Sequence, residues 1–585
     1  MLRNVRKITP LLRSLVLGVA TVSAVSVSSA VLVGCEDENQ PEYYTKRLDD
    51  PALRPQSIKR LVQFFEDAMT RADKNREDPK VKELLDKIVP PLTKTYMEGD
   101  TIDDRTKGEI IKLLADTRDE RAKPAWVKAL KDYKPNVTEP DIRASAKAIA
   151  ETGLKDPEAM DALIGVFVQF EAGSKKGSLI YMDFKKALVD ISAPSWKPQL
   201  LERLNRPMEK LSQTDKTNED KITAYRNEQF WQVTAAEILG NIKAADSIKS
   251  LFKTVIDPNK ADVAATAVVA MVKMGKDSMN TLIDALLGKD AEIAEFAKGK
   301  IKDAKEAAIS PVRSAALVIG TIGRVDGVQP LLLALDKADK NDVITRAVIA
   351  RELSKCPPTP ESLKAYIDVY NNMPVSAVIP PGNTAVDVLS ESMAQYYDPS
   401  VIDVLIKRGN EFKGEQEDRD VIRDTAMSTM IKLMRKDQVE LVEKTINEWA
   451  PKKDQAKLEK EALEKSKAVL NACGEKLECY LAKLEESAVQ EKKEQFQGIK
   501  AAYMLAILGN DKTRMEIVQR FPKIKNAAIK FTAGQALDHL APKGDKAAAD
   551  EIEKQLLVNI EKGDNNLISG DAPLRQIRFR LLARL

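Results

Sequence analysis

A short pattern of small residues and aspartates recurs along this chain and restricts its fold more than any other sequence feature. Three copies align without gaps: DIRASAKAIAETGLKDPEAMDAL from Asp141, WQVTAAEILGNIKAADSIKSLF from Trp231 and PVRSAALVIGTIGRVDGVQPLL from Pro311. Fainter copies begin near Lys185, Ile344, Arg419 and Gly498. The aligned positions are a small residue, an alanine four residues before it and an aspartate six residues after it: Ala150, Gly240 and Gly320; Ala146, Ala236 and Ala316; Asp156, Asp246 and Asp326. Internal repetition of this kind predicts one structural unit stacked many times.

Each position in the pattern has a helical explanation. Alanine and glycine on one face let two helices pack closely, and a small residue near a helix end tolerates the turn that follows. The aspartate then caps the next helix through its carboxylate. We therefore predict helix caps at Asp156, Asp246, Asp326 and, from YDPSVI, Asp398. Apolar residues follow at three- and four-residue steps, which indicates one buried stripe per helix.

The pattern resembles HEAT repeats, in particular the short type also found in phycobilin lyases, where R-x-x-A-A-x-x-L-G and a capping aspartate mark each helix pair. The resemblance implies an all-α fold, an α-solenoid of stacked helix–turn–helix (HEAT/ARM-like) repeats, over residues 56–585. The solenoid could bend or split near 373–384, where MPVSAVIPPGNT is rich in proline, and near 450–490. The last stretch, APLRQIRFRLLARL, carries four arginines and is expected to cap the end of the array.

The amino-terminal residues predict export. Residues 1–13 contain four basic residues and no acid, and residues 14–34 are uncharged, as in a secretory signal peptide over 1–34. Leu32-Val33-Gly34-Cys35 resembles the bacterial lipobox. That resemblance implies cleavage between Gly34 and Cys35, a diacylglycerol on the Cys35 sulfur, and a fatty-acyl chain such as palmitate on the new amino terminus. An uncleaved membrane helix and ordinary secretion are the alternatives.

The lipobox resemblance also implies a location. Residues 35–55 would form the lipidated cysteine and a polar tether, and the body would be anchored to a membrane of the bacterial cell envelope, mostly facing the periplasm. The choice between inner and outer membrane stays open. Four of the 92 lysines and arginines precede Cys35, so 88 remain against 89 acids. This near-neutral body gives no electrostatic case for binding nucleic acid.

Two cysteines near the carboxyl-terminal end are close in sequence. Cys473 and Cys479 lie in NACGEKLECYLAKL, where Gly474 is placed to end a helix. A disulfide is the preferred interpretation, since an exported protein can keep one. Two free buried thiols are the second, and metal ligation is the third because His539 is the only histidine. Cys356 is expected to be a structural thiol.

The sequence offers no residue that we would assign to catalysis, a metal or a cofactor. Neither HExxH nor G-x-S-x-G occurs, and AGSKKGS from Ala172 has the wrong glycine spacing for a phosphate-binding loop. His539 lies near a predicted helix end, where the helix dipole would favour an imidazolium. The recurrent arginines are expected to bridge neighbouring repeats through aspartates: Arg143, Arg313 and Arg423.

These expectations favour a binding function over a catalytic one. We expect a lipid-anchored envelope scaffold that binds an unidentified protein or peptide partner. Its concave surface would be formed by the second helices of the pairs, which start near Glu158, Ser247, Gly327, Ser400 and Gln438. A structural or assembly subunit of an envelope complex is the alternative. An enzyme, or a chromophore-binding protein like the lyases, ranks last.

Overall fold

The chain folds almost entirely into α-helices. The computed structural model describes residues 37–99, 101–172, 178–379, 382–452, 454–486, 495–562 and 565–585. Over these ranges it contains 29 α-helices and a single hairpin of two very short strands. The predicted signal peptide, Gly34 and Cys35 lie outside the described residues. None of the helices in the described ranges is both long and apolar enough to cross a membrane.

Contacts divide the chain into two compact units, Met1–Leu92 and Thr93–Leu585, with the boundary inside helix α3. The described part of the first unit contains α1 (Pro41–Thr45), α2 (Arg54–Arg71) and most of α3 (Pro79–Glu98). Helix α1 packs on α2, and Tyr44 and Leu48 are buried. The prediction of a polar tether over 35–55 is therefore wrong from Pro41 onward, because these two apolar side chains fold this segment onto the unit.

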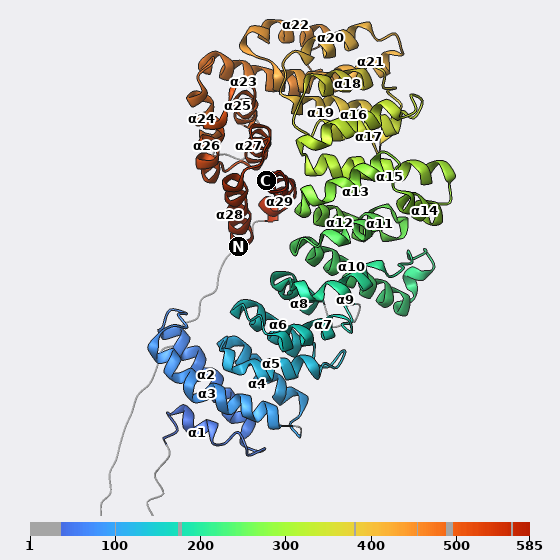
Figure 1. The fold of residues 1–585 in the computed structure, drawn as a ribbon. Coiled ribbons are helices and arrows are strands. Elements are labelled where there is room, and N and C mark those ends of the chain that lie inside the picture. Colours follow the sequence, from blue (N-terminus) through green and yellow to red (C-terminus); the bar gives the residue numbers. More distant parts are fainter. Residues whose placement is uncertain are drawn as a thin grey trace, which may run out of the picture. The chain divides into compact units, whose positions relative to one another are not determined.

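The second unit is a solenoid of helix pairs (Figure 1). Consecutive first helices pack on each other along the array, for example α4 on α6, α15 on α17 and α25 on α27. The first helices are α4 (Asp104–Thr117), α6 (Glu139–Thr152), α8 (Ser178–Ile191), α10 (Glu219–Asn241), α12 (Ala261–Met274), α15 (Ala304–Ile322), α17 (Val343–Leu353), α19 (Ala385–Met393), α21 (Gln416–Leu433), α23 (Lys457–Cys473), α25 (Gln495–Leu508), α27 (Ala527–Leu540) and α29 (Asn565–Ala583). The all-α solenoid predicted from the sequence is confirmed.

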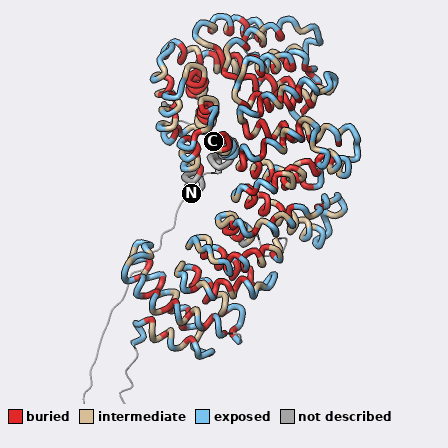
Figure 2. The backbone as a smooth tube through the Cα atoms, viewed as in Figure 1, coloured by how far each residue is buried: buried red, intermediate tan, exposed pale blue. Residues whose placement is uncertain are grey.

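The second helices complete the pairs. They are α5 (Lys123–Lys131), α7 (Pro157–Phe167), α9 (Lys197–Asn205), α11 (Ile248–Ile256), α13 (Lys276–Leu286), α16 (Val328–Lys337), α18 (Pro360–Asn371), α20 (Val401–Glu411), α22 (Val439–Trp449), α24 (Leu477–Glu486), α26 (Asp511–Arg520) and α28 (Lys546–Lys562). An additional helix, α14 (Ala291–Lys300), packs on α11 and α15. The buried residues form a band between the stacked helices (Figure 2).

The small residues of the repeat lie where helices approach most closely. A Cβ added at Gly240 would lie 2.6 Å from the Ala270 Cα in α12, and one at Gly320 would lie 2.6 Å from the Glu352 Cβ in α17. The three aligned alanines are fully buried: Ala146, Ala236 and Ala316. The repeated pattern therefore encodes the spacing between neighbouring first helices.

The predicted caps are only partly correct. Asp156 caps α7, since its carboxylate accepts a hydrogen bond from the Ala159 N–H at 3.1 Å. Asp398 accepts from the Ser400 N–H at 2.9 Å, but this closes a turn, and α20 begins only at Val401.

The cap predictions at Asp246 and Asp326 are wrong. Each residue lies inside a short 3₁₀ turn, η4 (Ala245–Ser247) or η6 (Val325–Gly327), and neither carboxylate caps the helix that follows. Backbone carbonyls close both turns, so the carboxylates are used elsewhere. Asp246 binds Lys197 at 2.6 Å, and Asp326 binds Arg324 at 3.1 Å.

The predicted interruptions are local features of the second unit. The 373–384 segment forms the hairpin of β1 (Val378–Ile379) and β2 (Asn383–Thr384), and Pro380 and Pro381 lie outside the described residues. Neither this segment nor 450–490 divides the unit. A disulfide joins Cys473, the last residue of α23, to Cys479 in α24, with 5.3 Å between the two Cα atoms. Gly474 has a φ of 59°, which ends α23 as expected from the sequence.

The carboxyl-terminal helix does not simply cap the last repeat. Helix α29 packs on its neighbours α27 and α28 but also on α12 and α15, which lie near the middle of the chain (Figure 1). The second unit therefore returns on itself, and the segment from α12 to α29 forms a closed loop. The expectation of an ordinary terminal cap was wrong because Arg584, directly after α29, has partners on both sides of this closure.

Candidate binding cavity at the closure

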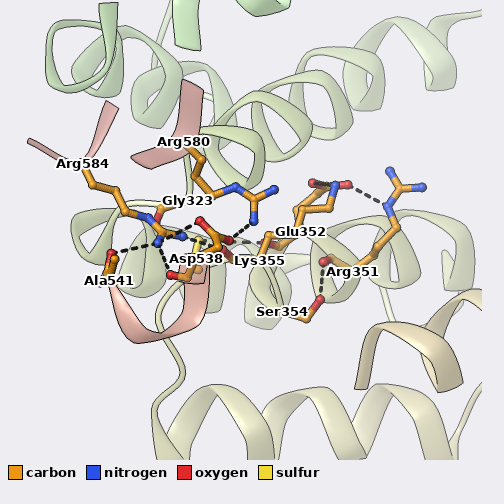
Figure 3. Close-up of polar contacts among 10 residues, drawn as sticks. Gly323, Arg351, Glu352, Ser354, Lys355, Asp538, Ala541, Arg580 and Arg584 are labelled. Atoms are coloured by element: carbon orange, nitrogen blue, oxygen red, sulfur yellow. Dashed lines mark hydrogen bonds and ion pairs between the residues drawn. The ribbon is translucent and has the colours of Figure 1, made fainter. Parts of the chain in front are cut away.

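Arg584 joins the two sides of the closure through backbone carbonyls (Figure 3). Its Nε donates to the Gly323 carbonyl at 2.7 Å, and its Nη1 donates to the Asp538 carbonyl at 2.7 Å. Further hydrogen bonds reach the carbonyls of Ala541 and Lys355. In the opposite direction, Arg324 donates to the Ala583 carbonyl at 3.2 Å. The buried Arg584 therefore binds the end of α15, the end of α27 and the segment after α17 simultaneously.

Gly323 makes this arrangement possible. It follows α15 with a φ of 66°, a conformation that favours glycine. A Cβ at this position would lie 2.7 Å from the Arg580 Cδ and 2.9 Å from the Arg584 Nη2. Gly323, the second glycine of IGTIG, therefore ends α15 and also leaves room for Arg580 and Arg584 at the closure.

A cluster of buried charges surrounds this contact. The Asp538 carboxylate binds the Arg580 Nη1 at 2.6 Å and the Arg584 Nη1 at 3.1 Å. A second carboxylate, that of Glu352, has no solvent exposure and binds the Arg351 Nε at 2.7 Å and the Lys355 Nζ at 2.6 Å. The cluster therefore contains four cations and two carboxylates. Each carboxylate pairs with cations on its own side of the closure, so the contact between the two sides is made by the backbone hydrogen bonds of Arg584 and Arg324.

A cavity of about 170 Å³ opens beside the charge cluster. Three of its lining side chains are glutamines from different elements, and they make no hydrogen bond with any described residue: Gln395 of η7 (Ala394–Tyr396), Gln535 of α27 and Gln576 of α29. The Arg580 Nε is buried and also lacks a hydrogen-bond partner. Gln395 and Gln535 are half-buried and Gln576 is exposed, so their amide groups are accessible to a polar ligand in the cavity.

An aromatic wall borders the same cavity. The His539 and Tyr397 ring centroids are 4.4 Å apart, and Phe531 also lines the space. Tyr397 has a φ of 51°, which is a strained conformation for a bulky side chain and is often found at functional sites.

His539 and Cys356 both line the cavity, and neither resembles a catalytic group. Burial lowers the pKa of His539 to about 4, so its imidazole is neutral at pH 7. The predicted imidazolium is therefore wrong, because desolvation outweighs the helix dipole. Burial raises the pKa of the Cys356 thiol to about 12, and a thiol that remains protonated is a weak nucleophile.

A larger groove adjoins the cavity. Both are lined by Pro358 and Tyr397, so they share a wall. The groove has a volume of about 660 Å³ and is lined by apolar side chains from α18, η7 and α25, among them Leu363, Ile367, Tyr396 and Ile507, with Lys364 and Arg435 as its cations. Arg435 also lines a further hollow of about 440 Å³ beside Met504 and Leu508.

The predicted bridging arginines act mainly between repeats. Arg143 binds Asp183 of α8. Arg313 binds Asp342, the N-cap of α17, at 3.3 Å. Arg423 instead donates to the Gly409 carbonyl at 3.0 Å, so its predicted aspartate partner was wrong. Among the described residues, no group of three or more His, Cys, Asp or Glu side chains could hold a metal ion.

The glutamines of the cavity were not found from the sequence. They come from three segments far apart in the chain, and no local motif marks them. The sequence did draw attention to His539, Cys356 and two arginines of the last stretch, all at this cavity, but none of them was assigned to binding. No family model matches this chain, and no curated protein matches it significantly. The structure defines the class as an all-α solenoid that closes on its own middle repeats.

Proposed function

We propose that this protein is a lipid-anchored scaffold of the bacterial cell envelope that binds a protein or peptide partner on its HEAT-like solenoid. The observation that carries the binding part is the cavity at the closure, which is lined by three glutamines without hydrogen-bond partners in the described chain and adjoins an apolar groove. Ligand sites combine this kind of apolar surface with a few convergent polar groups. A large groove beside it offers room for a polypeptide.

The anchoring part rests on the amino-terminal sequence. Leu32-Val33-Gly34-Cys35 follows an uncharged stretch of 21 residues, 14–34, and matches the lipobox pattern. The Cys473–Cys479 disulfide supports export, because disulfides persist in oxidising compartments and are rare in the cytosol. Attachment to a membrane would restrict the search for a partner to a surface and raise the effective concentration.

The anchor is tested by fractionation of cells that express Cys35→Ser or, as a matched control, Cys356→Ser. We expect the wild type and the Cys356→Ser protein in the membrane fraction, labelled by a fatty-acid probe. The Cys35→Ser protein should keep its leader and lose the label. Lipid labelling of Cys35→Ser at the wild-type level would exclude lipidation at Cys35.

The binding surface is tested by a photo-crosslinking amino acid at Leu363 or Ile367 in the groove, with Leu333 as the control. Leu333 is 51% exposed on α16 and does not line the groove. Discrete adducts in envelope preparations from the two groove positions, and none from position 333, are the expected result. Adducts that form equally from all three positions would show that the groove is not the binding surface.

A further inference from the structure

We infer that the cavity and groove bind the carboxyl-terminal end of a partner polypeptide, with its terminal carboxylate in the cavity and the preceding residues along the groove. This inference rests on the proposed function and specifies the chemistry of the partner. It follows from three observations: the sign of the charge at the cavity, the glutamine amides without partners and the adjacency of the two spaces.

The charges at the cavity favour an anion. Arg351, Lys355, Arg580 and Arg584 stand against Glu352 and Asp538, which leaves an excess of two positive charges. His539 is neutral at pH 7 and adds none.

Arg580 is the cation best placed to bind such an anion. It pairs with Asp538 only through Nη1, so its Nη2 has no hydrogen-bond partner among the described residues. Arg584 donates instead to four backbone carbonyls and is already satisfied. A carboxylate is the group that the planar edge of an arginine binds best.

The glutamines favour a peptide over a simple anion. Each primary amide offers two N–H donors and one carbonyl acceptor, and a peptide backbone needs both. Inorganic phosphate or acetate could accept from the N–H groups but would leave the carbonyl oxygens of Gln395, Gln535 and Gln576 largely unused. The residue that carries a terminal carboxylate also carries a backbone N–H, so it can use both parts of these amides.

The groove offers space for the ligand residues that precede the terminal carboxylate. Pro358 and Tyr397 line both the cavity and the groove, so the two spaces are adjacent and one chain end can reach both. The groove's apolar lining from Leu363, Ile367, Tyr396 and Ile507 suits apolar side chains just before the terminus. A small free anion would fill the cavity alone.

The test uses the full-length lipoprotein purified in detergent. A library of random ten-residue peptides displayed with free carboxyl termini is selected on it, and the best sequences are synthesised with an amino-terminal fluorophore. Each is made as the free acid and as the carboxyl-terminal amide, and Kd is measured by fluorescence anisotropy. We expect the amide to bind at least about tenfold more weakly, the effect of a lost charge-assisted hydrogen bond.

Two site variants and one control link that difference to the cavity. Gln535→Ala and Gln576→Ala should each weaken binding of the free acid about threefold to tenfold, the range of one hydrogen bond. Their melting temperatures should stay close to that of the wild type, because neither side chain makes a hydrogen bond within the described chain. Gln519→Ala, on the exposed face of α26, should leave both the Kd and the melting temperature unchanged.

Three results would overturn the inference: no peptide is selected, acid and amide bind equally, or the glutamine variants bind like the wild type. The proposed function can survive each of them. Crosslinks from Leu363 and Ile367 to a partner, combined with equal affinity for acid and amide, would show that the groove binds an internal segment. Loss of both the crosslinks and the peptide binding would remove the proposed function as well.

Discussion

Gly240 shows how one residue sets the distance between two helices. Its position in α10 faces the backbone of α12, with the Ala270 Cα 2.6 Å from where a Cβ would stand. The contacting atoms belong to a main chain and an alanine, so neither can rotate away. The repeated small residue is therefore a packing requirement, which is why sequence alignment of the copies could find it.

We predict that Gly240→Ala destabilises the second unit by about 1–3 kcal/mol, the usual cost of forcing an extra carbon into a packed interface. The measurement is urea-induced unfolding followed by circular dichroism. Gly165→Ala is the matched control, since Gly165 lies inside α7 with no atom within 4 Å of an added Cβ. That variant should gain up to about 1 kcal/mol from helix propensity. If both substitutions changed the free energy of unfolding equally, the close contact between Gly240 and α12 would not explain the effect.

The aspartates show where residue-scale reasoning stops. The cap at Asp156 was predictable because Asp-Pro followed by a helical pattern specifies a local structure. At Asp246 and Asp326 the same residue type lies inside a 3₁₀ turn and pairs with a cation instead. Lys197, the partner of Asp246, is 49 positions earlier in the chain. A carboxylate that can either cap a helix or bind a distant lysine cannot be assigned from its neighbours in sequence.

At the scale of elements, the helix pairs were predictable because most of their contacts are local. The apolar stripe of each helix packs on the next helix in the chain or on the one after it. The corner between α23 and α24 is a further local element, in which Gly474 ends the first helix and the Cys473–Cys479 disulfide fixes the turn. The spacing of the two cysteines was enough to favour this bond.

We predict that removing this bond with the double variant Cys473→Ser/Cys479→Ser lowers the free energy of unfolding by about 2 kcal/mol, from the loop-closure entropy of so short a ring. Urea titrations of the wild type and the variant measure the difference. Reductant should destabilise the wild type by the same amount and leave the double variant unchanged. A variant as stable as the oxidised wild type would contradict the prediction.

Helix α29 is the element that the sequence could not place. Its length and its arginines are visible in the sequence, but its partners in α12 and α15 are not. The hydrogen bond between Arg324 and Ala583 spans 259 positions. A contact of that range leaves no periodicity or motif, so a terminal helix on the last repeat was the natural expectation.

At the scale of the whole second unit, closure changes how the repeats depend on each other. In an open solenoid each repeat contacts only its neighbours, and stability is approximately a sum of local terms. Here α29 connects the last repeats to the middle ones, and the same contact assembles the cavity from segments near residues 355, 396, 538 and 580. The site could not be predicted from the sequence because it exists only once the loop is closed.

This closure leads to a prediction about Arg584, the residue with hydrogen bonds to both sides. Arg584→Met keeps most of the side-chain volume but leaves the carbonyls of Gly323, Asp538, Ala541 and Lys355 without this donor. We expect a loss of about 3–5 kcal/mol in the stability of the closure, as for other broken buried charge contacts. Amide hydrogen exchange followed by mass spectrometry should show faster exchange at the end of α15 and in α27 together, because both lose the same partner.

Three comparisons separate closure from general destabilisation. Arg575→Met, at an exposed position in α29, should leave the exchange pattern unchanged. In Arg584→Met, exchange in α6 and α7 should also stay at the wild-type level, because α29 does not pack on them. Deletion of residues 565–585 should reproduce the Arg584→Met pattern and extend it to α12, where α29 packs. Uniformly faster exchange across all helices would mean that Arg584 supports the fold as a whole, and unchanged exchange in α15 would mean that the loop stays closed without it.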